Sequence, residues 1–263
     1  MKMLENIIKN KIIEVEILKS STKYELDNMI KTQSNNYNFL SRLKNVSQDG
    51  SNPIIAEIKR KSPSKGNLDS KLDVKVLSKI YEDNGAACIS VLTDEKFFGG
   101  NIRDLQLVKE NVSIPVLRKD FIIDEYQLLE SKYHGADCVL LIVACLEEKK
   151  LRLLLQMCKK LNLQALVEVH TLDEMHIALR NEAYLIGINN RNLKTFEVDI
   201  NTTTQLSKLK NGNTMLVSES GLKDRETLDK LKKCGVDAFL IGESLVTSQN
   251  PSKNLRELVG NVK

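Results

Sequence analysis

Residues 84–92 (NGAACISVL), 134–142 (HGADCVLLI) and 234–242 (CGVDAFLIG) decide the fold of this chain. In each stretch a glycine follows an amphipathic segment and precedes a short apolar run. Glycine at the end of a helix lets the chain turn through a left-handed conformation that costs other residues more. The three stretches therefore predict the same unit three times, a helix that ends at the glycine and then a buried strand.

Eight apolar runs of this kind follow the first fifty residues, with amphipathic stretches between them. Their spacing of roughly 20 to 35 residues from strand to strand suits strand–helix units. Buried strands that alternate with helices indicate parallel pairing. The predicted strands are residues 54–58, 88–93, 116–119, 138–143, 165–169, 185–189, 215–218 and 238–241.

The length of 263 residues is close to the size of one closed barrel, for which roughly 250 residues are typical. A doubly wound open sheet is the rival, but it would normally carry a glycine-rich dinucleotide loop after its first strand. Residues 59–66 (KRKSPSKG) lack that loop's G-x-G-x-x-G pattern. Fewer than 25 residues follow Ile241, too few for a second barrel. We therefore predict an α/β fold, a single (β/α)₈ TIM barrel with an N-terminal helical extension.

The first fifty residues lack the alternation of short apolar runs and amphipathic stretches found in the rest of the chain. We assign residues 1–50 to a helical extension that caps the barrel, and residues 51–263 to the barrel, within one domain overall. A second short helix is expected over residues 23–31, an apolar turn around Phe39, and a loop over 45–53. We expect the helices to cross the top of the barrel and help close the site, although a purely stabilising cap would show the same pattern. The first helix is predicted from apolar residues at helical spacing, namely Leu4, Ile7, Ile8, Ile12, Val15 and Leu18.

Composition excludes several classes of protein. Hydrophobic residues make up 41% and charged residues 28% of the chain, as in ordinary globular proteins. The net charge of +4 is spread along the chain and gives no case for nucleic-acid binding. No apolar run is long enough to span a membrane, and the charged N-terminus does not read as a secretory signal.

The cysteines and histidines indicate no metal site. Five cysteines occur without a C-x-x-C pair, and Cys88 and Cys138 lie inside apolar runs. Buried, reduced thiols in a cytoplasmic protein are therefore expected. The three histidines lack zinc-ligand spacing, so we expect no metal.

Polar residues at the ends of the apolar strands mark the candidate active site. In a barrel of this kind the active site lies at the carboxyl ends of the strands. Glu57 and Lys59 are two residues apart and so point to the same side of the first strand. Either alone could be a structural ion pair, but six such residues at one end favour acid and base catalysis. They are Glu57, Lys59, Lys119, Glu168, Asn189 and Glu219.

Two glycine turns predict a phosphate site. Residues 217–221 (VSESG) and 241–245 (IGESL) end the last two strands, where this fold recurrently binds phosphate. Gly221 and Gly242 let backbone N–H groups approach an anion, and Ser220 can add a hydroxyl. A short helix after Gly242 would favour negative charge at its start. Ordinary glycine turns are the alternative. The residues alone therefore predict a barrel enzyme that acts on a phosphorylated small molecule, with no cofactor motif.

Seven segments resemble the indole-3-glycerol phosphate synthase family. The resemblance covers nearly everything from Ile54 to Val246, whereas the first fifty residues match only in helical character. It implies a carbon–carbon lyase of tryptophan biosynthesis that converts 1-(2-carboxyphenylamino)-1-deoxyribulose 5-phosphate into indole-3-glycerol phosphate, CO₂ and water, without cofactor or metal. The segments are 54–68 (IIAEIKRKSPSKGNL), 90–100 (SVLTDEKFFGG), 115–127 (PVLRKDFIIDEYQ), 166–170 (LVEVH), 186–193 (IGINNRNL), 217–221 (VSESG) and 241–245 (IGESL).

The resemblance also implies residue roles. Lys119 would be the general acid at the C2 oxygen of the substrate, and Glu168 the general base or acid of the dehydration. Lys59 would bind the anthranilate carboxylate, with a share in acid catalysis left open. Glu57 would hold the lysine network, with a part in proton transfer also left open. The remaining implied residues are Asn189 and Glu219, which orient intermediates, Ser62 and Arg191, which contact substrate, and Ser220, Gly221, Gly242, Glu243 and Ser244, which bind phosphate.

Two other functions remain open at this point. A phosphoribosyl isomerase would be expected to carry an Asp or Cys acid–base pair at the strand ends rather than a Lys/Glu cluster. A non-catalytic sensor of a phosphorylated ligand would be expected to lose Lys119 or Glu168, and both are present. The residues do not reveal the oligomeric state, and a monomer is slightly favoured.

Overall fold

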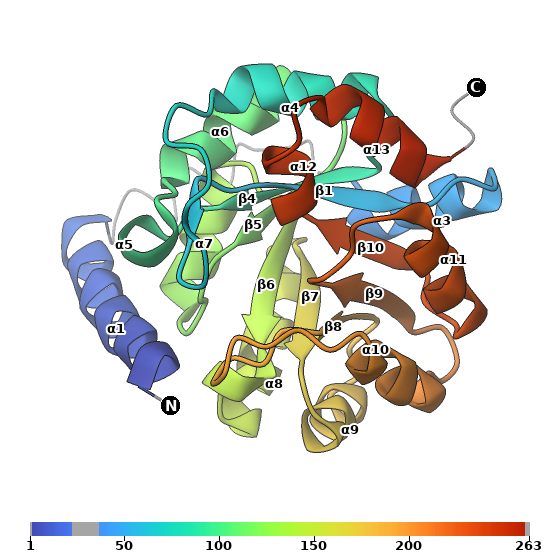
Figure 1. Ribbon diagram of the computed structural model, residues 1–263. Helices are drawn as coiled ribbons and strands as arrows, with labels where there is room; N and C mark the ends of the chain where they lie inside the picture. The colour runs from blue at the N-terminus through green and yellow to red at the C-terminus, as the bar shows by residue number, and fades with distance from the viewer. Residues whose placement is uncertain (1, 23–36, 261–263) are drawn as a thin grey trace.

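The computed structural model describes residues 2–22 and 37–260, and its centre is a closed barrel of parallel strands (Figure 1). The strand order around the ring is β1-β10-β9-β8-β7-β6-β5-β4, and β1 closes it by pairing with both β10 and β4. The predicted TIM barrel is confirmed, and each predicted strand lies within one residue of its observed bounds. The strands are β1 (Ile54–Ile58), β4 (Cys88–Leu92), β5 (Val116–Lys119), β6 (Cys138–Ile142), β7 (Gln164–Val169), β8 (Leu185–Asn189), β9 (Met215–Glu219) and β10 (Ala238–Ile241).

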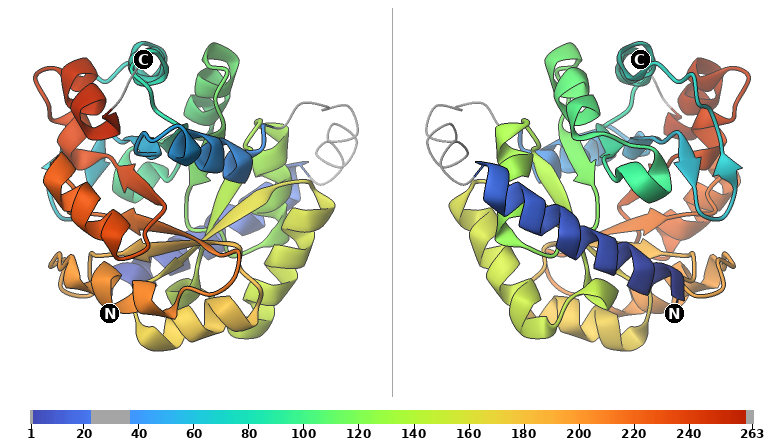
Figure 2. Two further views of the ribbon diagram at one scale, coloured as in Figure 1. Left: turned by 90° about the vertical axis from the view of Figure 1, so that its right-hand side faces the viewer. Right: turned by 90° about the vertical axis from the view of Figure 1, so that its left-hand side faces the viewer.

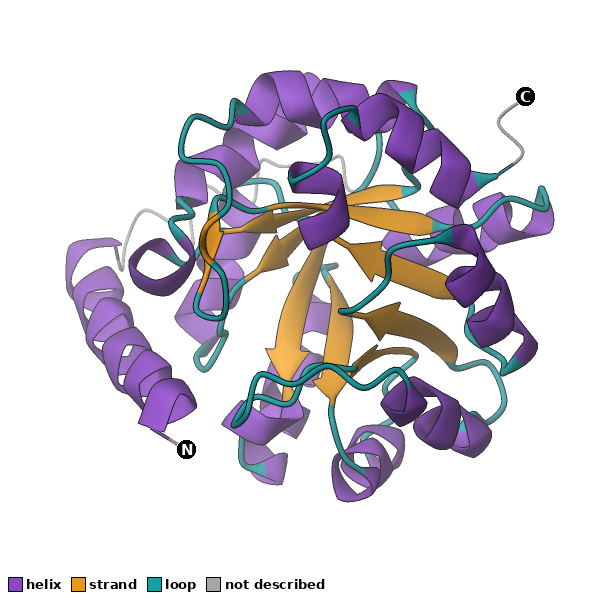
Figure 3. Cartoon of the chain, in the orientation of Figure 1, coloured by secondary structure: helices purple, strands orange, loops and turns teal. Residues whose placement is uncertain are grey.

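Helices surround the ring of strands (Figure 3). One longer helix follows each strand, and short pieces occupy several of the connecting loops. The helices after the strands are α4 (Val74–Asp83), α6 (Ile102–Asn111), α7 (Glu125–Tyr133), α8 (Glu148–Lys160), α9 (Leu172–Arg180), α10 (Asn201–Leu206), α11 (Arg225–Lys233) and α13 (Pro251–Val259). The short pieces are the hairpin β2 (Lys61–Ser62) and β3 (Gly66–Asn67), α5 (Glu95–Phe98), the 3₁₀ turns η2 (Val143–Cys145) and η3 (Ser207–Leu209), and α12 (Glu243–Val246).

The three glycines of the repeated unit adopt the predicted conformation. Gly85, Gly135 and Gly235 have φ angles of 91°, 87° and 92° and follow the ends of α4, α7 and α11. A Cβ would be strained at these angles. The glycines therefore let each helix reverse into the next buried strand.

The core has two layers. The larger one lies between the strands and the surrounding helices and includes Ile89 and Val139. The second fills the barrel interior with residues such as Ile55 and Leu166, and it also takes in Phe39 from outside the ring. The interior is packed rather than hollow, so the space available for a ligand lies at a mouth of the barrel.

The two described N-terminal helices lie at different places, α1 (Lys2–Thr22) and α3 (Phe39–Gln48) (Figures 1 and 2). The buried Lys11 of α1 forms ion pairs with Asp94 and Asp120, just beyond the carboxyl ends of β4 and β5. In α3, Arg42 bonds the carbonyl of Ala87 beside the start of β4. The expectation that these helices cross the top is therefore wrong for α3, which packs apolar side chains at the opposite mouth, whereas α1 lies beside the mouth where the strands end.

Three smaller expectations need correction or lie outside the structure. The predicted loop over 45–53 is wrong at its start, because α3 continues to Gln48 and buries Val46. Ile12 of the predicted apolar stripe is 48% exposed, whereas Lys11 beside it is buried. The helix predicted over 23–31 falls outside the described residues. No helix in the described part of the chain is long and apolar enough to cross a membrane.

Candidate active site

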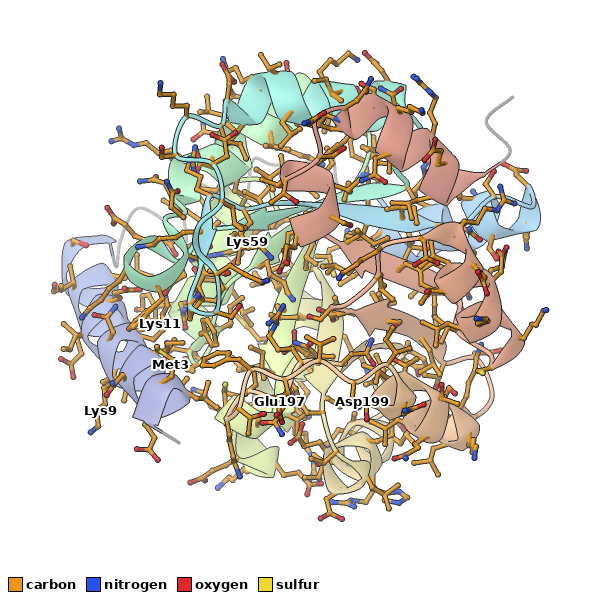
Figure 4. All side chains as sticks on the ribbon, in the orientation of Figure 1. Met3, Lys9, Lys11, Lys59, Glu197 and Asp199 are labelled. Carbon is orange, nitrogen blue, oxygen red and sulfur yellow. The ribbon has the colours of Figure 1, made fainter. Side chains whose placement is uncertain are left out.

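A cavity of about 900 Å³ opens at the carboxyl ends of the strands. Figure 4 shows Lys59 over this mouth, and Met3 on the side of α1 that faces the barrel. Every residue predicted for the site lines the cavity. They are Glu57, Lys59, Ser62, Lys119, Glu168, Asn189, Arg191, Glu219, Ser220, Gly221, Gly242, Glu243 and Ser244.

Lys119 lies at the centre of a cluster of polar side chains that line the cavity. Its Nζ is 2.7 Å from Oε2 of Glu219 and 3.1 Å from Oε2 of Glu168, and all three side chains are buried. The barrel supplies this convergence, because β5, β7 and β9 end at the same mouth. Asn189 is aligned with Glu219 across the β8–β9 pair, and its Nδ2 donates to Oε1 of Glu168 over 3.2 Å.

Glu57 and Lys59 form a second pair on β1 and in the residue after it. The Nζ of Lys59 lies 2.5 Å from Oε1 of Glu57, as their spacing on one side of the strand predicts. Gly242 faces Glu57, because a Cβ at that position would collide with the Glu57 carboxylate. Glycine at 242 is therefore required by close approach rather than by an unusual backbone angle.

Burial and charge push the two central carboxyl groups in opposite directions. Burial acts to raise the pKa of Glu168, but Lys119 and His170 outweigh it and hold that pKa well below its usual range. Burial, helped by the neighbouring Glu168 and Glu57 carboxylates, raises the pKa of Glu219 to about 7 despite Lys119. Burial would lower the pKa of Lys119, yet its three carboxylate neighbours raise it. One ammonium, one carboxylate and one readily protonated carboxyl group thus lie within a few ångströms of one another. This arrangement supports separate acid and base roles.

The two glycine turns also line the cavity. Ser220 and Gly221 both have positive φ angles, 67° and 78°, which is rare for serine. The buried side chain of Asn190 holds this turn by donating to the Ser220 carbonyl and to Ser218 Oγ. The short helix predicted after Gly242 is present as α12. Strained backbone of this kind clusters at active and binding sites.

Arg191 and Ser62 lie on facing loops above the cavity. The Arg191 guanidinium donates to Ser64 Oγ over 3.2 Å and lies 3.5 Å from a carboxylate oxygen of Glu243. Ser62 belongs to the β2–β3 hairpin that carries Ser64. The arginine therefore links the loop after β8, the loop after β1 and the start of α12.

Sequence reasoning missed the apolar wall of the cavity and the histidine behind Glu168. The wall consists of aromatic and aliphatic side chains from α1 and the loops, including Met3, Leu4, Phe98, Phe121 and Phe196. Phe98 and Phe121 lie in two of the segments that carry the family resemblance. Their position in those segments could have marked them as site residues. For Met3 and Leu4 there was no such signal, because helical spacing does not reveal what a helix packs against.

The chain matches the family model described as indole-3-glycerol phosphate synthase over residues 4–258. The chain belongs to this family. Among curated members of the indole-3-glycerol phosphate synthase family, the one from Aquifex aeolicus is 47% identical over 90% of this chain and 91% of its own. The one from Legionella pneumophila (strain Paris) is 43% identical over 98% of both chains.

Solved structures support the fold alone. The 3-hexulose-6-phosphate synthase from Salmonella typhimurium superposes with a TM-score of 0.63 at 15% identity, over 79% of this chain and 96% of that chain. Membership of the indole-3-glycerol phosphate synthase family therefore rests on sequence, and the barrel geometry agrees with it.

Proposed function

We propose that this chain closes the indole ring of indole-3-glycerol phosphate, starting from 1-(2-carboxyphenylamino)-1-deoxyribulose 5-phosphate and releasing CO₂ and water. The observation that carries the proposal is Lys119, held between Glu168 and Glu219 in the cavity that the two glycine turns also line. The cavity thus offers a positioned ammonium for a carbonyl, carboxyl groups for proton transfer and an anion site for a phosphate.

Ring closure uses the ammonium of Lys119. The aromatic carbon that bears the carboxylate attacks the C2 carbonyl carbon, and the carbonyl oxygen takes the proton from Lys119. CO₂ then leaves, and the electron pair of the broken carbon–carbon bond restores the aromatic ring. In the dehydration, the new hydroxyl leaves as water and the neighbouring carbon loses a proton, with Glu168 as the proton-transfer group.

The remaining residues bind and orient the substrate in this proposal. Lys59 pairs with the anthranilate carboxylate, and Glu57 holds Lys59 in place. The aromatic ring packs against Phe98 and Phe121, whose ring centroids are 6.0 Å apart. The phosphate binds at the residues of the two turns, and Asn189, Glu219, Ser62 and Arg191 contact the chain between the two ends. The phosphate site comprises Ser220, Gly221, Gly242, Glu243 and Ser244.

The test is incubation of the purified protein with the carboxyphenylamino deoxyribulose phosphate. We expect indole fluorescence to rise together with an equal amount of released CO₂. Binding without turnover would support a phosphate-ligand sensor instead. Isomerisation of a phosphoribosyl compound would support the isomerase, although the cluster of lysines and glutamates does not suit that chemistry.

Three expectations about the whole chain accompany this proposal. A biosynthetic enzyme for a small phosphorylated substrate is expected to act in the cytoplasm. It is expected to work as a monomer. Residues 1–50 are proposed to form a helical extension that caps the barrel, within one domain overall.

A further inference from the structure

His170 lies directly behind Glu168, one residue beyond the end of β7. Its side chain is largely buried between two carboxylates. Nε2 is 3.3 Å from Oε1 of Glu168, and Nδ1 is 3.1 Å from Oε2 of Glu174. The oxygen of Glu168 that faces His170 is the one that accepts from Asn189, while the other oxygen receives Lys119. The imidazole therefore completes the surroundings of the Glu168 carboxylate.

The two carboxylate contacts favour a charged ring. A neutral imidazole has one N–H, so one of its nitrogens would present a lone pair to a carboxylate. Among the described residues Nε2 has no well-aligned hydrogen bond, so its nearest partner, Glu168, interacts with it through charge. Burial acts to lower the pKa of His170, but the two carboxylates outweigh it and raise that pKa to about 9.

Glu174 fixes the position of the ring. The same Oε2 atom that faces Nδ1 also accepts from the backbone N–H of His170 over 2.7 Å. The backbone N–H of Glu174 is itself capped by Thr171 at the start of α9. The imidazole is thus held by a short, locally closed set of bonds and has little freedom to leave Glu168.

We propose that His170 is a positioning residue that holds the Glu168 carboxylate ionised and aimed into the cavity, with Glu174 as the anchor of the ring. This role rests on the proposed function, because it acts through Glu168. The charge of Glu168 is then set from two sides, by Lys119 in the cavity and by His170 behind it. A carboxylate held in this way can accept a proton during dehydration and return to its starting orientation.

In the described part of the chain, few groups that titrate lie near His170. Glu168 on β7 and Glu174 on α9 face the ring directly, and Lys119 lies beyond Glu168. Cys145 of η2 faces the same two carboxylates, and burial together with their charges raises the pKa of its thiol, so it stays neutral. Loss of a proton near pH 9 at this place therefore belongs to His170.

The test compares His170→Gln with His176→Gln, a matched change at an exposed position of α9. We expect His170→Gln to lower kcat by about tenfold, the scale of one lost charge-assisted contact, and to change KM by less than about twofold. The wild-type enzyme and His176→Gln should share a fall in kcat near pH 9, and His170→Gln should lack it. A His170→Gln variant with the wild-type rate and pH profile would overturn the role.

A second measurement does not depend on turnover. NMR titration of the three histidine rings should show one ring that titrates near pH 9, absent from His170→Gln and shifted toward the ordinary histidine value in Glu168→Gln. A ring of His170 that titrates below pH 7 in the wild-type protein would overturn the ion pair. A wild-type enzyme without turnover would contradict the proposed function and this role together, whereas turnover insensitive to His170→Gln would contradict only the role.

Discussion

At the scale of the residue, Lys119 concentrates the chemistry because three carboxyl groups surround one ammonium. Glu168 and Glu219 touch its Nζ, and Glu57 contributes through its charge. An ammonium held this firmly stays charged when substrate displaces water, and it has a fixed direction in which to donate. Lys59 has one carboxylate partner and is more exposed, which suits the binding of a substrate carboxylate.

The two lysines can be separated by single-turnover kinetics. We expect Lys119→Met to slow ring closure by about 10²- to 10⁴-fold, the scale of a lost general acid. Lys59→Met should mainly weaken substrate binding, because it removes the partner of the anthranilate carboxylate. Full chemistry in the Lys119→Met enzyme would overturn the assignment of Lys119 as the acid.

Glu219 should leave a signature in the pH dependence of stability. Its pKa of about 7 in the folded protein lies above the ordinary value for glutamate, so between these values the folded state binds more protons than the unfolded state. The contribution of this group to stability therefore falls as pH rises from about 5 to 7. Urea titrations should show wild type losing stability relative to Glu219→Gln across that window. Parallel curves for the two proteins would contradict the raised pKa.

Gly242 tests the close approach between the first and last strands. The added Cβ of Gly242→Ala would meet the Glu57 carboxylate and displace it from Lys59. We expect kcat/KM to fall by at least about tenfold, since small displacements of positioned groups are costly. Gly212→Ala is the control, because Gly212 has open space around it at a φ of 45° and precedes β9, away from the mouth where the strands end. If that variant loses more activity than Gly242→Ala, the close-approach argument is wrong.

At the scale of the element, α1 and α3 lie at opposite mouths of the barrel, whereas the sequence predicted that both belong to one cap. α1 reaches the cavity with Met3, Leu4 and Ile7, and Lys11 anchors it to Asp94 and Asp120. α3 packs Phe39 and Leu43 into the interior core at the other mouth. A deletion of residues 1–40 would therefore combine two effects, because it also removes Phe39.

Separate variants should resolve the two helices. Deletion of residues 1–22 should raise KM by about tenfold or more, because it opens one wall of the site. The barrel should still fold, because Asp120 keeps Arg118 and Thr93 as partners. Phe39→Ala should instead lower the free energy of unfolding by about 3 to 5 kcal/mol and leave KM unchanged. Unchanged kinetics after the deletion would make α1 a stabilising cap only.

At the scale of the whole molecule, the barrel could be predicted from the sequence, because each strand is a short apolar run bounded by a helix. The convergence of Lys119, Glu168 and Glu219 could be predicted from their positions at the ends of strands, before any contact between them was known. Contacts outside that rule could not be predicted. The buried Lys11 needs Asp94 and Asp120 from the loops after β4 and β5, far from it in the sequence. His170 becomes informative only once Glu174 is seen beside it.

The most direct measurement is a crystal structure with a substrate analogue whose keto group is reduced to an alcohol, so that ring closure cannot occur. The account predicts its phosphate at the turns of Gly221 and Gly242, its C2 hydroxyl within hydrogen-bond reach of Lys119, and its aromatic ring beside Phe98 and Phe121. An analogue bound in the reverse direction, or with its C2 hydroxyl remote from both Lys119 and Glu168, would contradict it.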